Sequence, residues 1–384
     1  MSVTHARGFE AAGIAAGLKS SGKPDIALVV KRGPLQNAAA VFTSNRSKAN
    51  PIIWSQQVIA DGTASAIILN SGGANCFTGA QGFQTTHATA EAVADALGVS
   101  SGDILVCSTG LIGDQLDRDK VLAGVTAAIA ALSPDGGLDA ARAIMTTDTV
   151  EKTATYTSDD GWAIGGIAKG AGMLAPGLAT MLVVLTTDAV VASAELDGYL
   201  RAATRLSFDR LDSDGCMSTN DQVSLLASGA SGVEPKPGEF AAAVADVCTS
   251  LAVQLQADAE GASHDIAILV HHAASEDDAV EVGRSVARNN LFKAAIFGND
   301  PNWGRVLAAI GTTNAAFDPY DVDVSMNGVR VCSQGAPDRP RAEVDLTPRA
   351  VSLVIDLKVG DASATIWTND LTHDYVHENS AYAS

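Results

Sequence analysis

Residues 169–189 read KGAGMLAPGLATMLVVLTTDA, and this stretch carries the most structural information in the sequence. Three glycines and a proline predict a turn, and a strongly apolar run follows it. The turn places Thr180 at the first position of that run. Since β-branched residues favour strands, the simplest interpretation is a buried strand that begins with a threonine.

A functional interpretation of Thr180 needs a reason for its hydroxyl to be reactive. A threonine hydroxyl is a poor nucleophile unless a base adjoins it, and an N-terminal α-amine can serve as that base. An internal threonine acquires such an amine only if the peptide bond before it is cut. The residue pattern alone does not show such a cut.

Short β-rich runs alternate with Ala-rich helical segments on both sides of this stretch. Strands are predicted at residues 26–31, 38–43, 66–69, 104–107, 154–157, 162–167, 181–185, 266–270, 322–326, 342–346 and 351–357. Helices are predicted at residues 90–97, 121–132, 240–256 and 279–295. This mixed order indicates an α/β or α+β fold with sheets covered by helices, and we take α/β as the prediction. A length of 384 residues favours two domains.

The charge balance excludes some partners. The formal net charge of -19 argues against nucleic acid, because a phosphate backbone requires a Lys/Arg surface. The longest apolar stretch, near residues 181–185, is far shorter than the ~20 residues of a spanning helix, so no membrane segment is expected. The first residues, MSVTHARGFE, contain no apolar signal core. We therefore expect a cytoplasmic protein.

Cysteine and histidine patterns give little sign of cross-links or metal. The five cysteines form an odd, scattered set without a CxxC pair, which favours reduced thiols. The seven histidines show neither HExxH nor HxH spacing, so no metal site is expected. His271 and His272 are adjacent, and in a regular strand they would point to opposite faces.

The ordered motifs of the chain resemble the ornithine acetyltransferase family, the bifunctional glutamate N-acetyltransferases of arginine biosynthesis. Residues 169–181 are similar to the family's self-processing segment. Further blocks are AVFTSN (40–45), NSGGANCFTG (70–79), CSTGLIG (107–113), AIMTTDT (143–149), STNDQ (218–222), DAEGA (258–262), GNDPNWGR (298–305) and NSAYAS (379–384). Each block alone is weak evidence, whereas the ordered series is specific.

The resemblance implies a set of catalytic residues. Family members cut the Ala-Thr bond of this motif, here the bond between Ala179 and Thr180, and the two chains stay associated. Thr180 then becomes the nucleophile and its new α-amine the base. The Thr109 hydroxyl and the Gly110 amide correspond to the family's oxyanion hole. The implied division is an α chain of residues 1–179 and a β chain of residues 180–384, within a two-lobed sandwich of the self-processing, N-terminal-nucleophile type.

The resemblance also implies substrate contacts and partners. The contacts carried over are Thr146, Lys169, Thr180, Glu260, Asn379 and Ser384. The implied substrates are N-acetylornithine and glutamate, with acetyl-CoA as a further donor in bifunctional members and no other cofactor. The implied assembly is a dimer or tetramer of cleaved pairs. The chain departs from the family pattern after DAEGA, where Ser263 and His264 replace an expected lysine.

Two other interpretations remain open from the residues. A self-processing aminopeptidase would use a Ser or Thr nucleophile in a similar place and hydrolyse peptides. A nucleotide-binding sensor would use the segment GGIAKGAGMLAPG as a phosphate loop. That segment lacks GxGxxG spacing and a GK[ST] ending.

Overall fold

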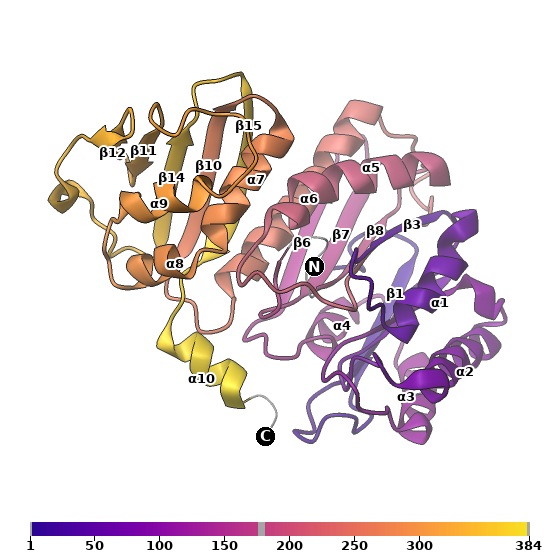
Figure 1. Ribbon diagram of the computed structural model, residues 1–384. Helices are drawn as coiled ribbons and strands as arrows, with labels where there is room; N and C mark the ends of the chain where they lie inside the picture. Colours follow the sequence, from indigo (N-terminus) through magenta and orange to yellow (C-terminus); the bar gives the residue numbers. More distant parts are fainter. Residues whose placement is uncertain (1, 176–180, 382–384) are drawn as a thin grey trace. The chain divides into compact units, whose positions relative to one another are not determined.

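The computed structural model describes residues 2–175 and 181–381, and it confirms the predicted α/β class. The chain forms two compact units. The first comprises Met1–Ala171, Gly177–Phe208 and Met217–Leu255. The second comprises Gly172–Pro176, Asp209–Cys216 and Gln256–Ser384. Figure 1 shows both units and labels many of their helices and strands.

The first sheet of unit 1 has four strands in the order β1-β2-β4-β5. Their bounds are β1 Phe9–Ile14, β2 Ile26–Lys31, β4 Ala66–Asn70 and β5 Ile104–Ser108. β4 and β5 run parallel, whereas the other pairs are antiparallel. Helices α2 (Gly79–Leu97) and α3 (Arg118–Ala130) cover one face, where Val93 and Val125 pack with Leu28 and Val106.

The second sheet of unit 1 has five strands in the order β3-β9-β8-β7-β6. Their bounds are β3 Ala38–Phe42, β6 Lys152–Thr157, β7 Ala163–Lys169, β8 Leu182–Thr187 and β9 Gln222–Ala227. The remaining helices of this unit are α1 Asn50–Val58, α4 Gly137–Ala143, α5 Ser193–Leu206 and most of α6 Pro237–Ala257. One core joins both sheets and α4, with Leu69, Val184 and Ala140 among its buried members. Unit 1 is therefore a sandwich of two sheets.

Helix α6 covers the outer face of the second sheet. The side chains of Leu251 and Val247 contact the position that a Cβ on Gly166 of β7 would occupy. The ring centroids of Phe240 and Trp162 are 5.4 Å apart. Within the described residues α6 is also the one helix long and apolar enough to cross a membrane, which the sequence analysis missed. Half of its most apolar window is buried in the protein, as in the core helix of a globular domain.

Unit 2 contains a six-stranded sheet in the order β13-β12-β11-β14-β10-β15. Its strands are β10 Asp265–Ala273, β11 Asp323–Met326, β12 Val329–Ser333, β13 Ala336–Pro337, β14 Ala350–Asp356 and β15 Ala362–Asn369. Its helices are α7 Glu276–Ala287, α8 Asn290–Phe297, α9 Trp303–Ile310 and α10 His373–Ala381. Ile268 of β10 and Leu353 of β14 pack with Val282, Phe292 and Val306 of three helices.

Two sequence predictions in unit 2 are wrong for local reasons. The single helix predicted at residues 279–295 is two helices, because the Asn289 side chain caps α8 by accepting from the Phe292 amide at 3.0 Å. The strand predicted at residues 342–346 is absent. Arg341–Glu343 form a short 3-10 turn after Pro340 instead.

The expectation that His271 and His272 face opposite sides of a strand is also wrong. Val270 pairs with Ala364 and Ala273 pairs with Ala362, so two residues of β10 lie opposite one residue of β15. This is a β-bulge, and His272 takes a left-handed φ of 52°. Both histidines therefore lie on the same, less buried face of the sheet.

The two compact units do not correspond to the two covalent chains expected from cleavage. The expected division at the bond between Ala179 and Thr180 stays a prediction.

We predict that Phe240→Ala lowers the free energy of unfolding by about 3–5 kcal/mol, because it leaves a cavity between α6 and the sheet. The matched control is Val253→Ala on the same helix, whose side chain is 45% exposed. It should change stability by less than about 0.5 kcal/mol. Urea midpoints measure both. Equal effects would show that α6 is not packed as described.

Candidate active site

The ends of two strands in unit 1 bring a lysine and a threonine of the recognised motifs together. Lys169 is the last residue of β7, a run in which every residue is buried. Thr109 follows β5 directly. The Lys169 Nζ donates to Thr109 Oγ1 at 3.2 Å, and both side chains are buried. Two predicted site residues far apart in sequence are therefore in contact.

Asp148 organises the charges around this contact. Its carboxylate accepts from Lys152 Nζ at 2.7 Å, from the Gly170 amide at 2.7 Å and from the Thr146 amide at 2.9 Å. Burial by itself would raise the pKa of Asp148, but the charges of Lys169 and Lys152 and these hydrogen bonds lower it to about 2. Asp148 therefore stays ionised and joins the Thr146 loop to the end of β7.

Gly110 is required by close packing at the adjoining turn. Its φ is 131°, and a Cβ there would lie 2.8 Å from the backbone of Gly73. The Thr109 carbonyl accepts from the Gly73 amide at 3.0 Å. The CSTG and NSGG blocks therefore meet backbone to backbone, and a side chain at position 110 would separate them.

The STNDQ block closes the same region. Asn220 Nδ2 donates to the carbonyls of Ala74 at 2.6 Å and Ser108 at 2.8 Å. Thr43 of the AVFTSN block donates from Oγ1 to the Ser218 carbonyl at 2.7 Å. Four motifs recognised only by their order in the sequence thus surround the Thr109 turn in space.

Sequence reasoning overlooked Asp221 and Asp148. Asp221 is fully buried, and its Oδ1 accepts from the Met181 amide at 3.0 Å. Burial raises its pKa well above the usual range. The signal was available, since Asp221 stands between polar residues and an apolar strand and Asp148 lies within the TTDT motif. Asp148 accepts a hydrogen bond from the Gly170 amide and Asp221 from the Met181 amide, so the two acids bind the backbone on either side of residues 171–180.

Three predicted residues lie outside the described part of the chain: Ala179, Thr180 and Ser384. Residues 165–169 of the segment GGIAKGAGMLAPG lie in strand β7, and a bend follows them instead of a helix. A phosphate loop needs a helix N-terminus after its glycines. The described residues therefore do not support the nucleotide-binding interpretation.

Within unit 2, Glu260 and Asn379 are in contact. Asn379 Nδ2 on α10 donates to Glu260 Oε2 at 2.9 Å. Gly172 of the KGAGM motif lies against the same carboxylate, and a Cβ on it would stand 2.2 Å from Glu260 Oε2. Two predicted substrate contacts are therefore adjacent, beside a glycine that leaves room for the acid.

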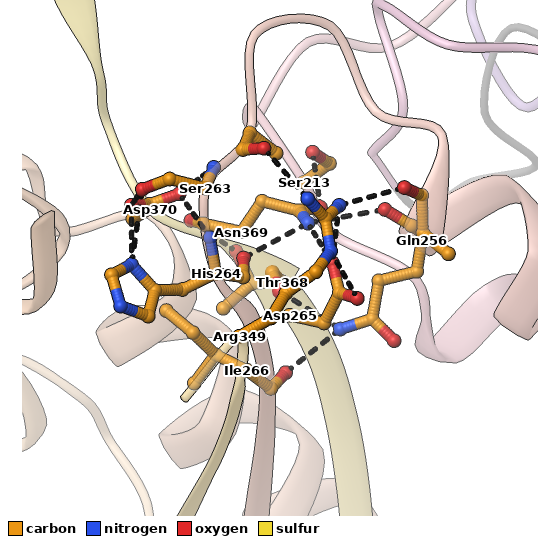
Figure 2. A network of polar contacts seen from close by, with 12 residues as sticks. Ser213, Gln256, Ser263, His264, Asp265, Ile266, Arg349, Thr368, Asn369 and Asp370 are labelled. Carbon is orange, nitrogen blue, oxygen red and sulfur yellow. Dashed lines mark hydrogen bonds and ion pairs between the residues drawn. The ribbon is translucent and has the colours of Figure 1, made fainter. Parts of the chain in front are cut away.

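His264, which stands where the family pattern has a lysine, belongs to a structural network (Figure 2). Its Nδ1 pairs with Asp370 Oδ2 at 2.8 Å, and its Nε2 lies 2.9 Å from the Leu346 carbonyl. Asn369 beside it binds the carbonyls of His264 and Gln256 at 3.1 Å each. Both ring nitrogens of His264 have partners within the protein, which join the segments before β10, after β15 and before β14, so the side chain is not directed at a substrate.

A cavity of about 240 Å³ opens beside this network in unit 2. Its lining carries three carboxylates and two basic groups, from Glu260, Asp214, Asp370, Lys293 and Arg288. Burial raises the pKa of Asp214 and lowers that of Lys293 to about 8. The cavity is therefore lined by polar and ionisable groups of both signs, with Glu260 among them.

Comparisons with known proteins agree with the motifs. The model of the ArgJ family matches residues 10–384. The arginine biosynthesis bifunctional protein ArgJ of Streptomyces coelicolor is 63% identical, and that of Thermobifida fusca 60%, each over 384 residues and 100% of both chains. The ornithine acetyltransferase of Mycobacterium tuberculosis, solved with ornithine, is 52% identical over 47% of this chain and 96% of its own, with a TM-score of 0.45. Because the family match spans nearly the whole sequence, this chain belongs to the ArgJ family.

Proposed function

We propose that this protein is a self-processing ornithine acetyltransferase of arginine biosynthesis. It moves the acetyl group of N-acetylornithine to glutamate through an acetyl ester on Thr180. Membership of the ArgJ family over the full length carries this proposal. The gathering of the ordered motifs around the Lys169–Thr109 contact supports it.

The first half of the reaction follows from the chemistry of an N-terminal threonine. After the bond between Ala179 and Thr180 is cut, the new α-amine takes the proton from the Thr180 hydroxyl. The oxygen then attacks the acetyl carbonyl and forms a tetrahedral intermediate. When that intermediate collapses, the C–N bond to ornithine breaks, and the proton held by the amine passes to the departing nitrogen.

Lys169 prepares Thr109 for its role as an oxyanion donor. A hydroxyl that accepts one hydrogen bond still carries its own hydrogen, which points away from the donor. Because Lys169 donates to Thr109 Oγ1, the Thr109 hydrogen is directed elsewhere and can bind a developing oxyanion together with the Gly110 amide. The Lys169 ammonium also places a positive charge directly beside this donor.

The second half transfers the acetyl group to glutamate. The amine of glutamate attacks the ester carbonyl, its proton passes through the Thr180 amine, and the Thr180 oxygen leaves as a hydroxyl. Lys169 pairs with the α-carboxylate that both substrates share. Glu260 and Asn379 contact the amino-acid substrate, with Thr146 and Ser384 as further contacts. The acidic lining around Glu260 suits the side-chain ammonium of ornithine.

The remaining assignments follow from the same proposal. We infer that acetyl-CoA serves as a second donor and that the chemistry of the ester intermediate needs no metal or other cofactor. We place the enzyme in the cytoplasm as a dimer or tetramer of cleaved pairs. An aminopeptidase acting through the same nucleophile would instead hydrolyse peptides, and a transfer assay in water separates these activities.

We expect purified wild-type protein to give two fragments in denaturing mass spectrometry. The smaller fragment should have a mass of about 18 kDa, in proportion to its share of the 39.1 kDa chain. Thr180→Ala should give one intact chain, because the nucleophile of the cut is gone. An intact wild-type chain in an active preparation would refute the α-amine as base.

Thr109→Ala should lower kcat of the cleaved fraction about 100-fold, the effect of losing one oxyanion donor worth ~3 kcal/mol. Thr109→Ser keeps the hydroxyl and should restore most of the rate. Steady-state transfer from acetylornithine to glutamate measures both variants. If serine and alanine are equally slow, the hydroxyl is not the donor.

Glu260→Gln should raise KM for acetylornithine about 10-fold or more, because the substrate ammonium loses its charged partner. The matched control is Asp258→Asn, which makes the same change of charge two residues earlier. It should leave KM near the wild-type value. A similar KM for both variants would remove Glu260 from substrate recognition.

A further inference from the structure

The bulge in β10 gathers three side chains that bind metals on one face of the unit 2 sheet. His271 would face this side in a regular strand, and the extra residue at the bulge turns His272 to the same side. On the neighbouring parallel strand β14, Asp356 pairs with His271 in register. Two imidazoles and one carboxylate therefore stand together at the ends of two adjacent strands.

The distances within this cluster are short. His272 Nδ1 lies 2.8 Å from Asp356 Oδ1, and His271 Nε2 lies 3.8 Å from Asp356 Oδ2. The two imidazole centroids are 4.3 Å apart. One ligand atom from each residue falls within 4.8 Å of the others. None of the three side chains is used in the proposed acetyl transfer.

We propose that His271, His272 and Asp356 form a binding site for a divalent transition metal, with Zn²⁺ as the best match. Zinc takes imidazole nitrogen and carboxylate oxygen at about 2.0–2.2 Å, so tetrahedral ligands stand about 3.3 Å apart. In the structure the three ligand atoms lie up to 4.8 Å apart. Side-chain rotations that move these atoms by about 1 Å would bring them to the separation that zinc requires. Three protein ligands leave the fourth position for water. The sequence analysis expected no metal site, and this proposal departs from that expectation.

Charges around the cluster favour a cation. Asp323 pairs with Asp356 in register on β11, so a second carboxylate adjoins the cluster. Lys358 Nζ binds Asp323 at 2.7 Å and Asp321 at 2.9 Å, and Arg330 lies 3.6 Å from Asp323. The three carboxylates of Asp321, Asp323 and Asp356 exceed the two cations, Lys358 and Arg330, by one negative charge. Nearby cations are therefore neutralised and do not repel a metal ion.

A hydrogen-bonded surface pair of histidine and aspartate would not require the observed backbone. His272 adopts a left-handed φ of 52°, a conformation that non-glycine residues rarely take. This conformation directs the His272 side chain to the face that carries His271. A metal bound by all three residues would link the ends of β10 and β14 and give a reason for the bulge.

The test uses tag-free, full-length protein dialysed against a chelator and titrated with ZnCl₂ by calorimetry. Variants are His271→Gln, His272→Asn and Asp356→Asn; asparagine at position 272 tolerates the left-handed backbone. The matched control is His87→Gln, which removes an exposed histidine 3.6 Å from the Glu91 carboxylate. Circular dichroism shows whether each variant is folded.

Wild type and the His87 variant should bind one equivalent of zinc, and each cluster variant should weaken binding about 10-fold or more. MgCl₂ should not compete, because magnesium prefers oxygen ligands. X-ray absorption at the zinc edge of wild type should show two imidazoles and no sulfur, which keeps the test decisive if a variant unfolds. Absence of saturable binding, a sulfur ligand, or unchanged affinity in folded cluster variants would overturn the proposal. Acetyl transfer is a separate measurement, so the two proposals fail independently.

Discussion

Two lysine ammonium groups and one carboxylate are buried together at the end of β7. Such charges are tolerated away from water only when they are paired and hydrogen-bonded. Asp148 meets that requirement by binding Lys152 and two backbone amides, while Lys169 is held near it and reaches Thr109. The requirement fixes the relative positions of β6, β7 and the loop after β5. The position of the turn at Thr109 and Gly110 is therefore a consequence of charge pairing in the core.

The sheet that carries this group also explains how a cut chain can stay folded. β8 begins directly after the described part of the chain resumes, and it lies between β7 and β9. Leu182 pairs with Lys169 on one side and with Gln222 on the other. β7 precedes the expected cut and β9 follows it, so the ladder joins segments of both chains. Asp221 adds a bond to the Met181 amide. Breaking one peptide bond leaves these contacts in place.

The sequence predicted the strands best where burial is continuous. Residues 26–31 match β2, since an unbroken apolar run between polar turns has one interpretation. Helix α2 was predicted to begin about ten residues too late. Its first half carries glycines and threonines, which are weak helix formers, and Thr86 and Thr89 bond back to carbonyls four residues earlier. The site residues came from motif order. Their contacts through Asp148 depend on pairings between distant segments, which periodicity does not encode.

The histidine pair shows where local rules stop. The rule that neighbouring strand residues alternate in direction assumes an unbroken register. Whether β10 contains a bulge depends on its pairing with β15, almost one hundred residues later in the chain. The same single-residue shift that ends the alternation places two imidazoles beside Asp356. The grouping of side chains at such a position depends on the difference in length between two paired strands. It therefore cannot be predicted from the sequence of either strand alone. Register departures in the sheet are therefore the places where a structure adds most to what its sequence predicts.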